Sequence, residues 1–336
     1  MGRKVNRMGI RRALSALLAA ACLLTLSGCA GAEAKKQSAV GFYLDTVVTL
    51  TAYVDDIEVL NDALQECGRY ERMLSRTIEG SDVWNINHAG GQPVQVADET
   101  VDILRTALEV AELSDGAFDV TIAPVSTLWD FTSGAAVLPD ADAIAESAQK
   151  VDWTRVAIDG NAVTLPEGMM IDLGGIAKGY IADAVKQYLA ARGVKSAILS
   201  FGGNIVAIGL KPDGSSWKVG IQDIDRPTGE YMLVARNSGG STVTSGIYER
   251  GFELDGVYYH HILDPDTGWP VQNALASVTI FSDSSMWGDA LATAAFILGG
   301  EKGAALIEGL SDIEAVFIDR DRTVRYTSGA ESYMVQ

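Results

Sequence analysis

Histidine is scarce in this chain: only three occur in 336 residues, and two of them are adjacent. His260 and His261 precede an acidic turn that ends at Gly268, whereas His88 lies in a polar stretch rich in asparagine and glycine. Imidazole can move a proton at physiological pH because its unperturbed pKa lies close to neutrality. The adjacent pair is therefore a candidate proton-transfer site. The alternative is a strand-end histidine bonded to the following turn.

Cysteine and basic residues are also few. Cys67 is the only cysteine outside the N-terminal segment described below, so a disulfide framework is excluded, and we expect Cys67 in the core of a helix. Lysine and arginine number 26 against 44 acidic residues, which gives a net charge of −18. Such a surface disfavours nucleic acid as a partner. A phosphorylated ligand would need a metal ion or a local nest of main-chain N–H groups.

Several common patterns are missing. There is no GxxxxGK[ST] phosphate loop, no GxGxxG fingerprint and no internal repeat of 20–50 residues. Helices and strands do not alternate regularly as they would in a doubly wound parallel sheet. Their order predicts an α+β fold with meander-like strands and inserted helices. About 300 residues follow the N-terminal segment, enough for one large domain or two interlocked subdomains.

Residues 1–28 have the organisation of a secretory signal. A basic region precedes the apolar segment Ala13–Leu26, which is short for a membrane span. The following Leu-Ser-Gly-Cys sequence resembles a bacterial lipoprotein signal, which implies cleavage before Cys29 and a diacylglycerol on its sulfur. One acyl chain binds a membrane weakly, whereas two or three hold firmly. We therefore expect residues 29–40 to form a flexible tether on the extracytoplasmic face of the cell membrane. The alternative is an ordinary signal peptide with a chance cysteine.

Hydrophobic periodicity predicts the main elements. Residues 45–54 alternate and read as a strand, and apolar spacing predicts helices over Asp56–Leu74 and Asp98–Leu113, with Asp98 as N-cap. Further helices are expected over Asp140–Lys150, Ile176–Arg192, Ser284–Leu298 and Glu301–Gly309. Further strands are expected at Ala157, Val163, Met169–Asp172, Ala197–Leu199, Asn204–Ile208, Trp217–Ile221, Tyr231–Ala235, Val257–Ile262, Ala276–Phe281, Ala315–Ile318 and Thr323–Tyr326.

A glycine-rich bend opens one of these helices. Asp172 is followed by Leu-Gly-Gly, and Lys178 falls in the first helical turn. Freed N–H groups and the helix dipole make such a bend suitable for an anion, and a lysine there is unfavourable unless it meets one. Phosphate is the natural candidate. The alternative is a tight strand-to-helix turn with Lys178 in solvent.

Asp289 and Thr293 stand four residues apart in a largely apolar helix, so they share one face. A buried carboxylate beside a hydroxyl needs partners, and a hard cation with oxygen ligands is one solution. The alternative is an N-cap-like aspartate with a threonine that bonds back to its own helix.

Two further stretches are polar. Residues 241–250, which include Ser245, are dense in hydroxyl groups and suit either phosphate oxygens or an exposed edge strand. Residues 114–124 form a polar turn leading into a strand that Pro124 ends. In that turn Asp119 could accept a hydrogen bond from a ribose hydroxyl or an amide, or could cap local main chain.

Together these segments resemble the ApbE family of FAD:protein FMN transferases. The matching blocks are SDGAFDVTIAPV, IDLGGIAKGYIAD, SFGGNIVAIG, STVTSGIYER, YYHHILDPDTGWPV and GDALATAAFILG, in family order across roughly residues 42–320. The resemblance implies a single T-fold-like α+β domain over residues 41–336 with mixed or antiparallel sheets. It also implies FAD and Mg²⁺, and transfer of FMN to a threonine of a redox protein with loss of AMP. An NADH:quinone-reductase-type subunit, or another extracytoplasmic flavoprotein subunit, would be the acceptor.

The resemblance also implies residue roles. His261 and Asp289 would be catalytic, and the metal ligands would be Asp289, Thr293 and a main-chain carbonyl, that of Gly175. The residues expected to line FAD are Ser75, Asp119, Thr121, Asp172, Lys178, Ser245, Tyr248, His261 and Ile262.

One position departs from the family pattern. Many members carry an aromatic residue that covers the isoalloxazine ring, where this chain has Thr77. Trp84, Tyr43 or an open face would replace it. Two other functions use the same residues: a metal-dependent FAD pyrophosphatase that gives FMN and AMP, and a non-catalytic flavin-binding lipoprotein.

Overall fold

A computed structural model describes residues 35–133, 135–226 and 229–335. The predicted signal peptide and Cys29 lie outside the described residues. The chain divides into residues 1–35 and residues 36–336, and everything described below concerns this second unit together with Lys35 at the start of its first strand.

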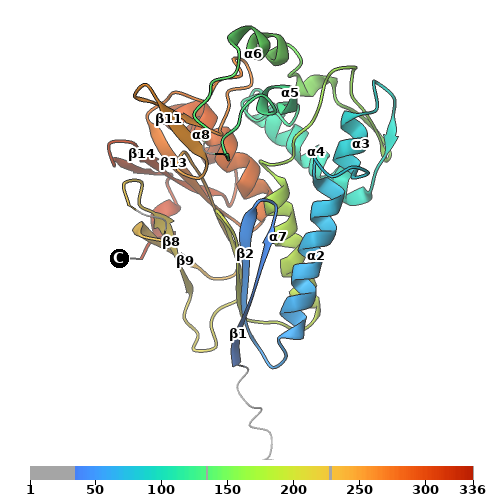
Figure 1. The fold of residues 1–336 in the computed structure, drawn as a ribbon. Coiled ribbons are helices and arrows are strands. Elements are labelled where there is room, and N and C mark those ends of the chain that lie inside the picture. Colours follow the sequence, from blue (N-terminus) through green and yellow to red (C-terminus); the bar gives the residue numbers. More distant parts are fainter. Residues whose placement is uncertain (1–34, 134, 227–228, 336) are drawn as a thin grey trace, which may run out of the picture. The chain divides into compact units, whose positions relative to one another are not determined.

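The second unit is built on one large sheet (Figure 1). Hydrogen-bonded neighbours follow the order β1 (Lys35–Tyr43), β2 (Thr46–Val54), β6 (Ala197–Phe201), β7 (Asn204–Ile208), β10 (Ser241–Gly246), β13 (Leu275–Ser282), β14 (Glu314–Asp319) and β15 (Val324–Tyr326). The registered pairs are antiparallel. The α+β class and the antiparallel sheet expected from the sequence are therefore confirmed.

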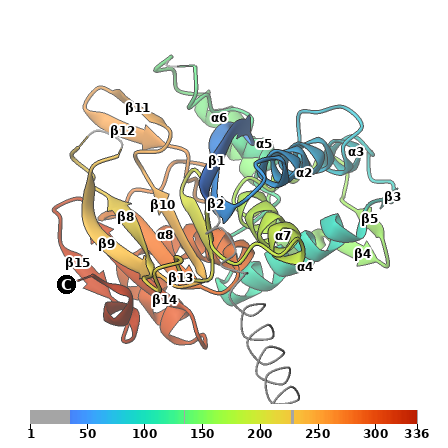
Figure 2. The same ribbon diagram turned by 90° about the horizontal axis from the view of Figure 1, so that it is seen from below.

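Helices cover one face of this sheet (Figures 1 and 2). α8 (Ser285–Glu308) packs on β10 and β13, α7 (Ala177–Ala191) on β6 and β7, and α2 (Glu58–Leu74) on β2. α4 (Asp98–Leu113) packs against α8. The helical stripe of α2 buries Leu60, Leu64 and Cys67, and burial raises the pKa of the Cys67 thiol to about 12. These contacts form the main core.

The opposite face of the sheet is covered in part. β8 (Trp217–Gln222) and β9 (Tyr231–Asn237) form a ribbon whose Ile221 and Ala235 pack on Phe281 of β13 and on β14. Every residue of β13 is buried as a result, because the strand is enclosed from both faces. The β1–β2 hairpin keeps exposed apolar residues instead.

Smaller elements complete the described part of the chain. They are α3 (Asp82–Asn87), α5 (Ala123–Ser126), α6 (Ala141–Ala148), the 3₁₀ turns Trp153–Arg155 and Ala330–Tyr333, the hairpin of β11 (Gly251–Leu254) and β12 (Val257–His260), and the small sheet of β3 (Val94–Gln95), β4 (Ala157–Asp159) and β5 (Ala162–Thr164).

Five expectations need correction. Residues 35–40 belong to strand β1 and not to a tether, because Ala39 is buried and Ser38 bonds Thr51 across the hairpin. Residues 169–172 make only an isolated bridge, from Met170 to Ile122, and the strand expected before Pro124 is instead the start of α5. The expected strand over residues 257–262 ends at His260.

The two helices expected after Ser284 are both present within α8 and meet at Gly299, whose non-helical φ of 81° only glycine adopts readily. Asp98 lies in the first turn of α4 and does not cap it; Ala97 occupies the N-cap. α8 is long and apolar enough to cross a membrane by length and composition. It packs on two strands and carries a buried aspartate, as a core helix does.

Candidate active site

The crossing of α7 and α8 fixes the centre of the site. A Cβ atom on Gly179 would overlap the main-chain carbonyl of Ser285, so glycine is required for the two helices to approach this closely. At the crossing, Asp289 Oδ2 accepts a hydrogen bond of 2.9 Å from the Gly179 N–H. The first turn of α8 is held to α7 as well, because Asp183 accepts from the N–H groups of Ser285 and Met286 at 3.0 Å.

Asp289 is 3% exposed and lies at the N-terminal end of α7, where the helix dipole favours a negative charge. The Lys178 ammonium lies 3.6 Å from its Oδ1 and donates to the Gly174 carbonyl at 3.1 Å. Lys178 therefore has an anionic partner within the protein. The alternative of a lysine turned freely into solvent is wrong.

Thr293 and Gly175 meet beside this aspartate. The Thr293 hydroxyl lies 3.4 Å from that of Ser245, and a Cβ on Gly175 would lie 3.7 Å from the same Thr293 oxygen. Thr293 also donates to the Asp289 carbonyl at 3.3 Å, as the alternative interpretation expects. One carboxylate, two hydroxyls and the main chain of a glycine turn make an all-oxygen donor set, which suits a hard cation such as Mg²⁺. No group of three or more His, Cys, Asp or Glu side chains suited to a metal occurs among the described residues.

His261 is held through one ring nitrogen by the main chain of Arg250. Its Nδ1 lies 3.3 Å from the Arg250 carbonyl oxygen, so Nδ1 carries the proton and Nε2 is the unprotonated acceptor. Burial lowers the pKa of His261 to about 3, and the charge of Lys178 adds to the effect. The charge of Lys178 therefore bears on both Asp289 and His261.

His260 has a different role. It is fully buried, its Nε2 lies 2.9 Å from the Val271 carbonyl, and its Nδ1 accepts from the Ile262 N–H at 3.3 Å. Both ring nitrogens are satisfied in the neutral form, and burial lowers the pKa of His260 to about 4. The strand-end alternative therefore describes His260, and His261 is the candidate for proton transfer.

Asp264 caps the turn and does not touch the catalytic imidazole. Its Oδ1 accepts from the Asp266 N–H at 2.8 Å, and its main chain bonds Trp269 and Gly268. The main-chain carbonyl of Arg250, and not the Asp264 carboxylate, lies against the His261 ring.

Glu249 is a site residue that the sequence analysis did not select. A Cβ on Gly203 would lie 2.8 Å from its Oε1, so the carboxylate reaches across the end of the β6–β7 hairpin. Desolvation by the surrounding protein raises the pKa of Glu249 even though part of the side chain reaches solvent, and Lys178 and Asp289 act on it electrostatically. Its position within the STVTSGIYER block was the available signal.

Asp172 organises the glycine turn. Its Oδ1 accepts from the Gly174 N–H at 2.9 Å, and its Oδ2 forms an ion pair with Arg76 at 3.1 Å. The Ser75 hydroxyl bonds Thr77 at 3.1 Å in the same loop. The loop that follows α2 therefore closes onto the start of the glycine turn, with Arg76 as the contact.

Asp119 and Thr121 lie near this turn with their polar atoms engaged locally. Asp119 accepts from the N–H and hydroxyl of Thr121 at 2.7 Å and from the Trp153 N–H at 3.0 Å, so it caps main chain as the alternative allowed. The neighbouring Phe118 would lie 3.1 Å from a Cβ on Gly175. These residues support the turn, and their contact with FAD stays a prediction.

Tyr248 and Ile262 are placed beside the others. The Tyr248 ring lies against Gly246, and burial raises the pKa of its hydroxyl to about 12. Ile262 is buried behind His261 in the main core. Ser245 is also buried, and β10 is a central strand, so the exposed-edge alternative for residues 241–250 is wrong.

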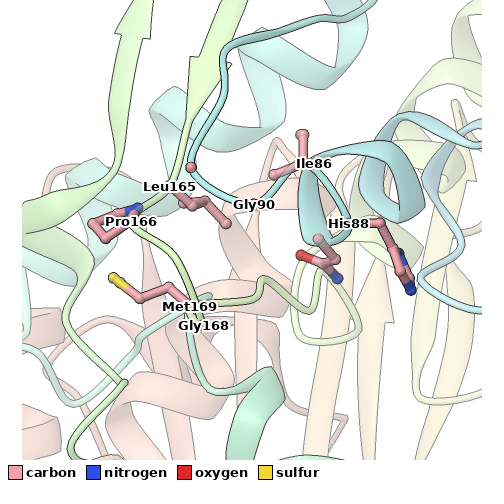
Figure 3. Close-up of a pocket in the computed structure, with 9 residues that line it drawn as sticks. Ile86, His88, Gly90, Leu165, Pro166, Gly168 and Met169 are labelled. Atoms are coloured by element: carbon pink, nitrogen blue, oxygen red, sulfur yellow. The ribbon is translucent and has the colours of Figure 1, made fainter.

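Both candidate substitutes for the flavin-covering aromatic make contacts within the protein. The Trp84 ring stacks on His88 at 4.0 Å, and Tyr43 wedges against Gly68 of α2. A cavity of about 180 Å³ beside His88 is lined by Ile86, Asn87, His88, Gly90, Gly91, Leu165, Pro166, Gly168 and Met169 (Figure 3). No predicted site residue lines it, so it is separate from the candidate active site.

Comparisons with known proteins identify a family. A sequence model of the ApbE family matches residues 44–317. The FAD:protein FMN transferase of Treponema pallidum is 40% identical over 276 residues, covering 77% of this chain and 76% of that protein. A Klebsiella pneumoniae protein with the same activity in its name is 35% identical, covering 84% and 88%.

Solved structures agree as well. The ApbE protein of Thermotoga maritima superimposes with a TM-score of 0.83 at 29% identity, covering 90% of this chain and all of that one. The flavin transferase ApbE of Vibrio cholerae gives a TM-score of 0.80 at 26% identity, covering 89% and 99%.

Proposed function

The chain belongs to the ApbE family, and on this basis we propose that its candidate active site moves FMN from FAD to a threonine hydroxyl of a target redox protein and releases AMP. A bond forms between the threonine oxygen and the FMN phosphorus, and the bridging P–O bond to AMP breaks. The hydroxyl proton must leave, and the phosphate charge must be balanced. The observation that carries the proposal is that Lys178 pairs with the Asp289 carboxylate at 3.6 Å at the start of α7, while the Arg250 carbonyl holds the Nδ1 side of the His261 ring.

His261 is the proton acceptor in this proposal. The Arg250 carbonyl holds the Nδ1 proton, so Nε2 is available to the attacking hydroxyl without rotation of the ring. The low pKa of His261 keeps the imidazole neutral at physiological pH, which is the form that a general base needs. AMP leaves as a stable phosphate anion that does not need to be protonated, so the reaction requires no general acid.

Lys178 and the first turn of α7 bind the pyrophosphate. Lys178 lies near the glycine turn, where main-chain N–H groups and the helix dipole favour an anion. Asp289, Thr293 and the Gly175 carbonyl would hold Mg²⁺, which supplies positive charge to the phosphates when bound. These residues give an acidic protein a local site for an acidic nucleotide.

We propose a location and a partner as well. Lipid attachment at Cys29 would keep the domain on the extracytoplasmic face of the membrane, near an acceptor such as an NADH:quinone-reductase-type subunit. Replacement of Cys29 by serine should abolish incorporation of radiolabelled palmitate and release the protein from the membrane fraction. Retained label would contradict the lipid anchor.

The decisive experiment is mass spectrometry of a mixture of the full-length chain in detergent, FAD, Mg²⁺ and a flavin-accepting domain of an NADH:quinone-reductase-type subunit. We expect the acceptor to gain the mass of one FMN on a threonine, and chelation by EDTA to prevent it. Appearance of free FMN and AMP without labelled acceptor would instead indicate an FAD pyrophosphatase. Bound, unchanged FAD with several acceptors would indicate a flavin-binding protein.

A further inference from the structure

The β1–β2 hairpin presents an apolar face that nothing in the described residues covers. Phe42 is 67% exposed, Val40 64% and Val47 54%. Val40 and Phe42 are two residues apart on one strand, so they share a face. The Ser38–Thr51 hydrogen bond and the two-residue turn Leu44–Asp45 place Val47 opposite Phe42 on that same face.

The outer edge of β1, which pairs with no strand in the described residues, lies beside this face. β1 is the terminal strand of the sheet order, and from Gln37 to Tyr43 it contains no proline and no charged residue. Proline and charged residues normally protect an edge strand from pairing with another chain. Lys35 and Lys36 protect only the start of β1. From Gln37 onward the hairpin combines an edge without such residues with an exposed apolar face, and both are features of surfaces that bind an extended polypeptide.

The hairpin is held rigidly. Its turn donates from the Leu44 N–H to Glu71 of α2 at 2.8 Å, and the Tyr43 ring packs against Gly68. Thr46 lies close enough to β6 for a Cβ on Gly202 to come within 2.8 Å of its hydroxyl. A preformed surface of this kind loses little conformational entropy when a partner binds.

The tip of the hairpin is also joined to the catalytic histidine. Arg250 donates from its guanidinium to the Asp45 carbonyl at 3.2 Å, and the carbonyl of the same Arg250 receives the His261 N–H at 3.2 Å and faces Nδ1. One residue therefore links the apolar hairpin to the proposed proton acceptor. A chain that pairs with β1 as far as the hairpin tip would end beside Arg250.

From this placement we propose that the face formed by Val40, Phe42 and Val47 docks the protein that receives FMN. The inference rests on the proposed function. The partner is an extended segment of the acceptor with apolar side chains beside its reactive hydroxyl: the apolar side chains pack on Phe42 and Val47, its main chain pairs with the edge of β1, and the hydroxyl reaches His261 past Arg250.

The test uses Phe42→Asp in the full-length chain, with Val40→Asp as a second variant should the first fail to fold by circular dichroism. The acceptor probe is the flavin-accepting domain of an NADH:quinone-reductase-type subunit. We expect KM for the acceptor to rise at least about tenfold, with KM for FAD and kcat within twofold of wild type. Phe42→Leu should restore most of the affinity. Tyr231→Asp, at a residue that is 62% exposed on the other ribbon, is the matched control and should leave the acceptor KM unchanged.

Acceptor binding is measured separately by biolayer interferometry without FAD, so that the docking surface and the transfer reaction can fail independently. Binding that depends on Phe42 without any transfer would support docking and refute the proposed function. Transfer with an unchanged acceptor KM in Phe42→Asp would refute docking alone. Two further results would refute docking if Phe42→Asp still binds the acceptor normally. One is a loss of binding to phospholipid vesicles, and the other is a loss of self-association detected by light scattering.

Discussion

The Nδ1 atom of His261 lies 3.3 Å from the main-chain carbonyl oxygen of Arg250. A carbonyl accepts hydrogen bonds only, so this contact fixes the tautomer and leaves Nε2 without a proton. Many catalytic histidines are oriented by a carboxylate, which also stabilises the imidazolium ion. The neutral carbonyl of Arg250 also orients the ring, but it stabilises the imidazolium ion less than a carboxylate would. The ring is therefore suited to accept a proton briefly and to pass it on.

His261→Ala should retain FAD binding and lose transfer. Removal of a positioned general base typically costs about 10²- to 10⁴-fold in rate, and the imidazole makes no ion pair that the fold requires. Equilibrium binding of FAD by fluorescence and initial rates of acceptor labelling measure the two effects separately. His88→Ala, an exposed histidine that stacks on Trp84, is the control. If the His261 variant lost FAD binding instead, the histidine would be a binding residue.

The pH dependence of transfer follows from the same residue. Burial lowers the pKa of His261 to about 3, so the free base predominates at every pH above that value. We therefore expect kcat/KM for the acceptor to lack an acid limb near pH 6.5 and to fall only as the pH drops toward 3. Rates between pH 5 and 8 decide the point, with circular dichroism at each pH to verify folding. An acid limb centred near 6.5 would mean that a less buried group is the base.

Asp289→Asn should abolish metal-dependent transfer while it keeps the fold. The amide retains an oxygen that accepts from the Gly179 N–H, but it removes the negative charge that pairs with Lys178 and attracts a cation. Titration calorimetry with Mg²⁺ and FAD should show loss of metal binding. Asp264→Asn is a matched control, because that carboxylate caps a turn. Turnover close to wild type in Asp289→Asn would refute the metal assignment.

Gly179→Ala should destabilise the protein, because a methyl group there meets the main chain of α8, which cannot rotate away as a side chain could. We expect a loss of roughly 2–3 kcal/mol in the free energy of unfolding, in the range for overpacked cores. Urea denaturation measures it. Gly193→Ala is a less crowded comparison, with nothing within 4 Å of the added atom, although its φ of +84° adds strain of its own. If Gly179→Ala cost less than Gly193→Ala, the close crossing of the helices would not be a constraint.

Much of this architecture could be predicted from periodicity. α2, α4 and α7 lie within a residue or two of their expected bounds, because each has an apolar stripe that only a helix can bury on one side. β1 was not predicted because it starts with polar residues and exposes Val40 and Phe42, so it lacks the alternation of buried apolar and exposed polar residues that marks a half-buried strand. The reason is physical: an edge strand forms because it pairs with a neighbouring strand, and the local sequence contains no information about that neighbour.

The site divides in the same way. Side chains that carry chemistry, such as Asp289 and His261, could be selected from their residue types and neighbours. The groups that orient them could not. The carbonyl of Arg250 and the N–H of Gly179 belong to the main chain, which every residue has. Only the tertiary fold decides which main-chain group faces a catalytic side chain.

Stability should fall on acidification because of His260. In the folded protein burial lowers the pKa of His260 from its ordinary 6.5 to about 4, since a proton on Nδ1 would oppose the Ile262 N–H. Below pH 6.5 the unfolded chain binds a proton that the native protein does not, so this stability is complete above 6.5 and is lost as the pH falls toward 4. The contribution is on the order of 3 kcal/mol. His260→Gln keeps a donor for the Val271 carbonyl and an acceptor for Ile262 but does not titrate. The free energy of unfolding of each protein is measured in urea at pH 7.5 and 4.5. Between these two pH values wild type should lose more stability than His260→Gln. Equal losses in both proteins would mean that His260 is protonated in the native state and that its buried hydrogen bonds tolerate the charge.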